Sequence, residues 1–214
     1  MGRDSGASGL SAREITVGYG KDAPILEGLS LDVLEGELTV IVGPNACGKS
    51  TLLRCLARVL GARSGVVELD GVELGTMNQK ALARRLGLLD QSSIAPGDML
   101  VEDLVARGRY PHHGLVRQWS AVDDEAVAGA MRDAGVSALA GRRVGELSGG
   151  QRQRVWIAMA LAQSTDILLL DEPTTYLDLN HQLEVLRLAQ RLQRQGRTIV
   201  AVLHDLHLAF RYAT

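Results

Sequence analysis

An eight-residue stretch of the chain combines glycine, lysine and serine in a spacing that suits phosphate binding. It reads Gly43-Pro44-Asn45-Ala46-Cys47-Gly48-Lys49-Ser50 and fits the pattern G-x-x-x-x-G-K-[ST]. In loops of this kind the backbone N–H groups surround phosphate oxygens, the lysine reaches the β- and γ-phosphates, and the hydroxyl of Ser50 coordinates Mg²⁺. We therefore predict that residues 43–50, with Thr51 next to them, bind a nucleotide, and we count Lys49 among the catalytic residues.

Two carboxylates stand side by side after an apolar run. Asp171 and Glu172 directly follow Ile167–Leu170. The carboxyl end of a strand in a parallel sheet is where such folds present ligand-binding side chains. We expect Asp171 to support Mg²⁺ and Glu172 to polarise the attacking water as a general base. The alternative is an acidic strand end that only faces solvent, and the phosphate-binding pattern elsewhere in the chain weighs against it.

The pattern of apolar residues places both motifs between strands and helices. Residues 38–42 form a continuous apolar strand before the glycine-containing loop, and residues 50–60 repeat apolar positions at helical spacing. A further apolar strand at 198–203 follows a helix predicted over 182–195, with Gly196 as its stop signal. Together with the strand at 167–170, these elements predict a β-α-β unit.

The first part and the middle of the chain show other patterns. Residues 10–19 and 29–34 alternate apolar with polar side chains, and residues 66–69 run into Asp70-Gly71, which predicts an antiparallel sheet with a tight hairpin. Residues 101–107, 123–134 and 151–163 have helical periodicity, and residues 108–119 form a loop between the first two. The apolar face of the third helix comprises Val155, Ala158, Met159 and Ala162.

These elements predict a single α/β domain over residues 1–214 with a mixed sheet core. Residues 1–90 and 164–214 are expected to form the nucleotide-binding core with its N-terminal antiparallel β region. Residues 91–163 are expected to form an inserted helical subdomain.

Composition excludes several classes of protein. The chain has 46% hydrophobic and 22% charged residues, which disfavours disorder, and its formal net charge of −2 lacks the basic excess of a protein held to nucleic acid by charge. Two cysteines are too few for a disulfide framework, which favours a reducing compartment. The longest apolar runs are of strand length, so we expect no membrane span. Because the net charge shows no basic excess, we also expect no nucleic-acid partner.

A segment before the carboxylates resembles a family motif. Leu147-Ser148-Gly149-Gly150-Gln151-Arg152-Gln153-Arg154 is similar to the signature motif of the ABC ATPases. The resemblance covers the chain from Tyr19 to about residue 214 and implies the P-loop NTPase fold of that family, the ABC ATPase fold. It also implies a homodimer in which residues 148–151 bind the ATP held by the partner, with Mg²⁺ as the metal. A helix start that offers N–H groups is a suitable anion site for this purpose.

Four more residues match family motifs and each keeps a simpler alternative. Tyr19 resembles the aromatic residue that stacks on adenine, and the alternative is an ordinary tyrosine at a strand end. Gln91 resembles the glutamine that senses Mg²⁺ and water, and the alternative is an ordinary loop residue. Asp178, in Tyr176-Leu177-Asp178, resembles the loop that crosses the dimer interface, or it only caps the next helix. His204 resembles the switch histidine that contacts the γ-phosphate, and the alternative is a core histidine.

Two segments resemble one branch of the family. Residues 108–112 with Trp119, and residues 177–186, look like ATPases of ferric-siderophore, haem and cobalamin importers. This resemblance implies a membrane permease as partner, indirectly a substrate-binding protein, and a position on the cytoplasmic face of the membrane. The alternatives are a solvent-exposed connection for the first segment and a generic amphipathic helix for the second.

Two departures from the family pattern leave alternatives open. Ala46 stands where nucleotide-binding loops often have glycine, and a left-handed backbone there would make alanine unfavourable by about 1 kcal/mol. The chain also stops ten residues after His204, where family members usually continue, which we interpret as a shortened C-terminal part. A truncated cassette that binds nucleotide without efficient turnover, and an ABC importer for another substrate, are therefore kept as alternative functions.

Overall fold

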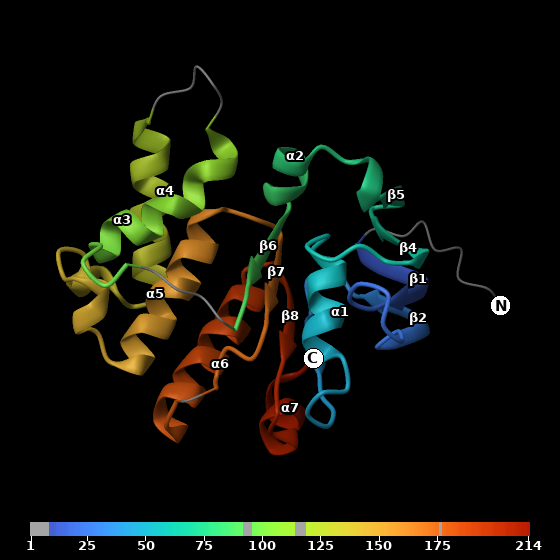
Figure 1. Cartoon of the computed structure of the whole chain (residues 1–214). Coiled ribbons are helices and arrows are strands. Elements are labelled where there is room, and N and C mark those ends of the chain that lie inside the picture. Colours follow the sequence, from blue (N-terminus) through green and yellow to red (C-terminus); the bar gives the residue numbers. More distant parts are fainter. Residues whose placement is uncertain (1–8, 92–95, 114–118, 176) are drawn as a thin grey trace.

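The computed structural model describes residues 9–91, 96–113, 119–175 and 177–214 and contains two four-stranded sheets (Figure 1). The predicted interface residue Tyr176 and the residues 114–118 of the predicted loop lie outside the described residues. Membership of the sheets follows the sequence pattern, because the alternating strands form one sheet and the continuous apolar strands form the other.

The first sheet is antiparallel, with the strand order β2-β1-β4-β5. Strand β1 (Leu10–Val17) pairs with β2 (Leu26–Val33) and with β4 (Ser64–Leu69), as predicted. The short strand β5 (Val72–Glu73) returns along β4 after Asp70 and Gly71. Both turn residues have positive φ, 53° and 74°, which is the geometry of a type I′ hairpin.

The second sheet is parallel, with the strand order β3-β8-β7-β6. Its strands are β3 (Leu38–Ile41), β6 (Leu86–Leu89), β7 (Ile167–Leu170) and β8 (Thr198–Val202). Every residue of β7 and β8 is buried, because helices cover both faces of the sheet. Sequence patterning named no strand at β6, whose four residues include a glycine.

Alternation along the parallel strands divides the core into two clusters. Ile167 and Leu169 of β7 belong to the cluster that holds Leu53 of helix α1 (Lys49–Leu56) and the residues of β1. Leu168 and Leu170 belong to the cluster on the opposite face, with helices α6 (Leu179–Arg194) and α7 (Leu206–Tyr212). Helix α1 therefore lies between the two sheets, as Figure 1 shows.

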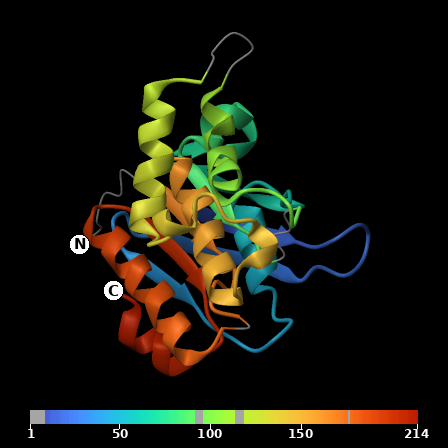
Figure 2. The same ribbon diagram turned by 90° about the vertical axis from the view of Figure 1, so that its left-hand side faces the viewer.

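The middle of the chain is helical and packs on the second cluster. It comprises α3 (Val101–Ala106), α4 (Ala121–Asp133), α5 (Gly149–Ala162) and short 3-10 turns at Arg107–His112, Ser137–Leu139 and Val144–Glu146. A further 3-10 turn (Leu74–Thr76) and helix α2 (Gln79–Ala83) precede β6. Figure 2 shows α3 and α4 in the upper part of the molecule and α6 and α7 in the lower part.

Two of the expected boundaries, and the expected apolar face of one helix, differ most from the structure. The helix predicted over 50–60 ends at Leu56, because the chain turns at Arg58, whose φ is 56° and whose guanidinium donates to the carbonyls of Leu74 and Met77. The first residues of the predicted loop 108–119 lie in a 3-10 helix. Helix α5 is buried beyond its predicted apolar face, since Trp156, Ile157, Ala160 and Leu161 are buried as well.

A buried ion pair joins the 3-10 turn after α3 to the start of α4. Arg109 is 3% exposed and Asp123 is fully buried, and the guanidinium Nε lies 3.0 Å from the carboxylate Oδ1. The same guanidinium donates to the carbonyl of Ala162 and the hydroxyl of Ser164, at the end of α5. Hydrogen bonds from the hydroxyl and N–H of Ser120, together with Arg109, lower the pKa of Asp123 to about 2 against the effect of its burial.

This pair is expected to make the stability of the protein depend on acid pH. The pKa of Asp123 is about 2 in the folded chain against 3.8 for the free side chain, so the unfolded state binds the proton more readily. The contribution of Asp123 is complete above pH 3.8 and is lost as pH falls toward 2. Urea unfolding at a series of pH values should show a fall in the free energy of unfolding that is shallower in Asp123→Asn. Equal slopes in the two proteins would contradict the assignment.

Candidate functional site

The glycine-containing loop connects β3 to α1 and lies between the two sheets. Gly48 caps α1 with a left-handed backbone, φ 97°, and a Cβ at this position would come within 2.8 Å of Ile25 and Leu26. Lys49 is 7% exposed, and its Nζ donates to the carbonyls of Gly43 and Pro44 at 3.0 and 2.7 Å. The ammonium group is therefore held inside the curve of the loop, where phosphate oxygens would meet it together with the N–H groups at the start of α1.

Ser50 and Asp171 meet across the sequence at the edge of this loop. The Ser50 hydroxyl donates to Asp171 Oδ1 at 2.8 Å. Asp171 is 1% exposed, and its burial raises the pKa of the carboxyl. The other carboxylate oxygen, Oδ2, is buried and has no hydrogen-bond partner among the described residues. A hydroxyl and a buried carboxylate oxygen with spare acceptor capacity are hard oxygen ligands, so the pair fits Mg²⁺.

Glu172 is the centre of a hydrogen-bonded group built from three strand ends. Its Oε2 accepts from Gln91 Nε2 at 2.6 Å and from Thr175 Oγ1 at 3.0 Å, and it lies 2.6 Å from His204 Nε2. Gln91 follows β6, Glu172 follows β7 and His204 follows β8. Because these strands are parallel neighbours, their carboxyl ends bring the three side chains together.

Thr175 is the member of this group that sequence reasoning missed. It lies three residues after Glu172, and its backbone N–H also donates to the carbonyl of Glu172 in a turn. Spacing alone gives no signal for such a contact, because a threonine in a turn after a proline is common. Glu172 itself has φ 49°, a left-handed conformation that is uncommon for a residue with a side chain and is a feature of functional sites.

Tyr19 lies beyond the end of β1 and is held by an arginine of α1. The Tyr19 hydroxyl accepts from Arg54 Nη1 at 3.2 Å, and hydrogen bonds with Arg54 and then Thr51 lower the pKa of the phenol. The side chain is exposed, so one face of its ring is accessible to a ligand.

The signature segment forms the start of α5. The Ser148 hydroxyl accepts from the N–H of Gln151 and the Gln151 side chain accepts from the N–H of Ser148, which is a capping box. Gly150 has no room for a side chain, because a Cβ would lie 2.3 Å from the ring of His181. In the part of the chain that the structure describes, no hydrogen bond or ion pair joins residues 148–151 to residues 43–51.

Asp178 connects the signature segment to α6. Its carboxylate caps α6 by accepting from the N–H of His181, and it lies 2.8 Å from Nδ1 of the same ring. The capping role that the sequence left open is therefore present. Because the His181 ring packs against Gly150, Asp178 also fixes the side chain that borders the signature segment.

The two cysteines lie in different environments. Cys47 is exposed, with its Sγ 3.9 Å from Lys49 Nζ. Cys55 is buried among apolar residues of α1, and burial raises the pKa of its thiol, as expected for a small core residue.

Ala46 has the left-handed backbone that the sequence analysis considered, with φ 61°. Replacement by glycine is expected to raise the free energy of unfolding by up to about 1 kcal/mol, because the strain of a Cβ in this conformation is removed. Urea unfolding of Ala46→Gly tests this. Ala128→Gly, in the exposed middle of α4, is the matched control and should lower stability by about 1 kcal/mol. A lower stability in both variants would contradict the argument.

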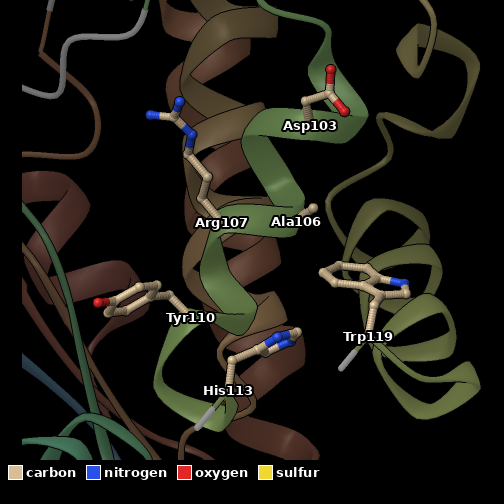
Figure 3. Close-up of a pocket in the computed structure, with 6 residues that line it drawn as sticks. All are labelled: Asp103, Ala106, Arg107, Tyr110, His113 and Trp119. Carbon is tan, nitrogen blue, oxygen red and sulfur yellow. The ribbon is translucent and has the colours of Figure 1, made fainter. Parts of the chain in front are cut away.

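An apolar groove of about 760 Å³ lies on the helical part of the molecule, away from the loop and carboxylates. Asp103, Ala106, Arg107, Tyr110, His113 and Trp119 line it (Figure 3). Tyr110 and Trp119 are 74% and 46% exposed, which is unusual for large aromatic side chains and is typical of a surface that contacts another molecule. In the described residues, no helix is both long enough and apolar enough to cross a membrane.

Comparisons with known proteins give a consistent result. A family model described as ABC transporter matches residues 26–175. The chain is 52% identical over 206 residues to the ferric enterobactin transport ATP-binding protein FepC of Escherichia coli, covering 96% of this chain and 76% of FepC. It is 45% identical over 205 residues to the iron(3+)-hydroxamate import ATP-binding protein FhuC of Bacillus subtilis, covering 95% and 76%. A dimeric bacterial ABC transporter cassette matches with a TM-score of 0.82 and 26% identity, covering 95% of this chain and 91% of that chain.

Proposed function

The chain belongs to the ABC transporter family of ATPases, and from this premise we propose that it is the ATP-binding subunit of an importer for ferric siderophores or haem. The observation that carries the proposal is the group Gln91, Glu172 and His204, which meets at the ends of three parallel strands beside Ser50 and Asp171. Such a group provides a general base and polar contacts at the position where the γ-phosphate of a nucleotide in the loop would end.

Binding of ATP is assigned to the loop and to Tyr19. Residues 43–51 supply N–H groups and the Lys49 ammonium to the phosphates. To reach them, the Nζ of Lys49 exchanges its present partners, the carbonyls of Gly43 and Pro44, for phosphate oxygens. Tyr19 offers its exposed ring to the adenine, a contact worth about 1–3 kcal/mol.

Mg²⁺ would be held by the Ser50 hydroxyl, the Asp171 carboxylate and the side-chain oxygen of Gln91. When bound, the ion neutralises charge on the phosphates. The unpaired Oδ2 of Asp171 is the atom that supports this assignment. The side-chain nitrogen of Gln91 donates to Glu172, which leaves its amide oxygen for the metal or its water.

Hydrolysis is assigned to Glu172 and His204. Glu172 takes up the proton of the attacking water, and its carboxylate is held in place by Gln91 and Thr175. His204, 2.6 Å from the same carboxylate, is positioned to donate to a γ-phosphate oxygen once ATP separates the two side chains. Lys49 and His204 together stabilise the charge that develops on the phosphate.

The complete site requires a second copy of the chain. Ser148, Gly149, Gly150 and Gln151 lie at a helix start. Among the described residues no hydrogen bond or ion pair joins them to the loop of their own chain, which supports binding of the partner's ATP in a head-to-tail homodimer. Asp178 is assigned to the same interface through His181. We also propose that the chain divides into a core, residues 1–90 and 164–214, and a helical subdomain, residues 91–163. In the closed dimer, the loop of one core would then face the signature segment in the helical subdomain of the partner.

The groove around Tyr110 and Trp119 is the surface that we assign to the membrane permease (Figure 3). Its exposed aromatic side chains supply apolar contact area for another protein. The chain would thereby act at the cytoplasmic face of the membrane, and a substrate-binding protein would deliver the cargo to the permease. The names of the relatives given above mention ferric enterobactin and iron(3+)-hydroxamate, which supports a ferric siderophore as cargo.

Three measurements test the proposal. Purified protein should hydrolyse ATP in the presence of Mg²⁺, and sedimentation should show an ATP-dependent dimer. The chain should also restore uptake of radioactive ferric enterobactin in Escherichia coli that lacks its own ATP-binding subunit for this transport. ATP binding without turnover or dimer formation would favour a nucleotide-binding cassette that is not competent alone. Turnover without uptake would favour an importer for another cargo.

A further inference from the structure

Arg54 makes contacts on two sides of the proposed nucleotide site. It lies on α1, four residues after Ser50, so both side chains project from the same face of the helix. Its Nε and Nη2 donate to the two carboxylate oxygens of Asp90 at 3.3 and 3.1 Å, and its Nη1 donates to the Tyr19 hydroxyl at 3.2 Å. One guanidinium therefore joins a residue near the end of β1 to a residue after β6.

Asp90 connects this guanidinium to the catalytic carboxylate. It directly precedes Gln91, whose amide donates to Glu172 at 2.6 Å. The contacts thus run from Tyr19 through Arg54 to Asp90, and along one peptide bond to Gln91 and Glu172. This path joins the side assigned to adenine with the side assigned to the attacking water.

A second arginine holds the backbone near Tyr19 through hydrogen bonds to three carbonyls. Arg63 donates to the carbonyls of Tyr19 and Gly20 at 3.2 Å each and to the carbonyl of Asp22 at 2.7 Å. A Cβ on Gly18 would lie 2.8 Å from Arg63 Nη2, so the close approach of this guanidinium requires glycine there. Arg63 fixes the backbone of residues 19–22, here called the Tyr19 turn, whereas Arg54 contacts the hydroxyl of the Tyr19 side chain.

We propose that Arg54 is a positioning residue that couples the placement of Tyr19 to the placement of Gln91, acting on the second through Asp90. The inference rests on the proposed function, because it concerns ATP hydrolysis at that site. Arginine suits this role because its planar fork donates to both carboxylate oxygens and still has an N–H for the phenol. Lysine has a single ammonium that cannot reproduce the bidentate geometry.

Steady-state ATPase measurements on the full chain with three single variants test the coupling. Arg54→Gln should raise KM for ATP and lower kcat, each by about 2–10-fold, the range expected for loss of a hydrogen bond. Asp90→Asn should lower kcat with little change in KM, because Asp90 adjoins Gln91, which contacts Glu172 on the side assigned to the attacking water. Arg63→Gln is the matched control and should raise KM with kcat unchanged, because it holds only the Tyr19 turn.

A double variant and a conservative variant separate coupling from general loss of structure. Arg54→Gln combined with Asp90→Asn should have the kcat of Arg54→Gln alone, because Arg54 acts on Gln91 through Asp90. Arg54→Lys should not restore the wild-type kcat. Thermal unfolding midpoints identify any variant that is merely unstable. If Arg54→Gln is unstable, the kcat and KM of Arg54→Lys are measured in its place. Multiplicative effects in the double variant, or full activity of Arg54→Lys, would overturn the proposal.

Failure of the inference and failure of the proposed function give different results. If wild-type protein hydrolyses ATP and Arg54→Gln equals it in KM and kcat, the inference is wrong and the proposed function stands. If wild-type protein hydrolyses no ATP, the proposed function fails, and equilibrium binding of ATP decides the inference. In that case an unchanged Kd in Arg54→Gln overturns it, and a Kd raised in both Arg54→Gln and Arg63→Gln supports the Tyr19 side of the coupling.

Discussion

Glu172→Gln is expected to lower ATP turnover by about 10²–10⁴-fold, the usual contribution of a general base. The amide keeps the shape of the side chain and its contacts with Gln91 and Thr175, so the arrangement of the strand ends should survive. It cannot accept the proton of the attacking water, which is why hydrolysis fails while ATP binding persists. Phosphate release under saturating MgATP gives the rate, and sedimentation with MgATP should show a shift from monomer to dimer.

The matched control for this change is Glu125→Gln, on the exposed surface of α4, which should leave turnover at the wild-type level. Near-normal hydrolysis by Glu172→Gln would remove Glu172 from the role of base. A protein that binds ATP but stays monomeric would instead indicate that the isolated chain does not close.

Arg109→Met is expected to lower the free energy of unfolding by about 3–5 kcal/mol, the range for breaking a buried ion pair from one side. Asp123 would remain fully buried without its arginine partner, and the carbonyl of Ala162 would lose a donor. Domains have a total stability of about 5–15 kcal/mol, so the loss is a large fraction of it. Urea unfolding followed by circular dichroism measures the change.

Arg107→Met is the control for this second variant, because Arg107 lies two residues earlier with an exposed side chain. Surface substitutions of this kind usually change stability by less than about 0.5 kcal/mol. Equal effects of the two substitutions would show that the ion pair carries no special stability. Restored stability on combining Arg109→Met with Asp123→Leu would identify the unpaired charge as the cause of the loss.

The parts of the fold set by local chemistry could be predicted from the sequence. The strands at 167–170 and 198–203 were recognised because residues buried on both faces give continuous apolar runs. Asp70-Gly71 predicted its hairpin because both residues tolerate positive φ. The apolar patterns of residues 38–42 and 50–60 predict a strand and a helix on either side of the glycine-containing loop, as a phosphate-binding loop needs.

Contacts between distant residues could not be predicted in the same way. Arg109 falls in the predicted loop 108–119, and a single charged residue gives no sign of a partner fourteen positions away. Arg58 ends α1 early through hydrogen bonds to carbonyls sixteen and nineteen residues later. The roles of Gln91 and His204 rest on family resemblance, and that of Glu172 rests on its place after an apolar strand. The distances that join the three depend on the order of the strands.

The position of β3 at the edge of its sheet has a consequence for synthesis of the protein. Among the described strands, β3 pairs with β8 alone, so the strand that carries the phosphate-binding loop has its neighbour about 160 residues later. Chains are made from the N-terminus, and contacts over long separations form late. A nascent chain can thus assemble its antiparallel sheet and α4 and α5 before the loop is supported. We therefore expect the loop to hold ATP only after residues 198–202 have been synthesised and have paired with β3.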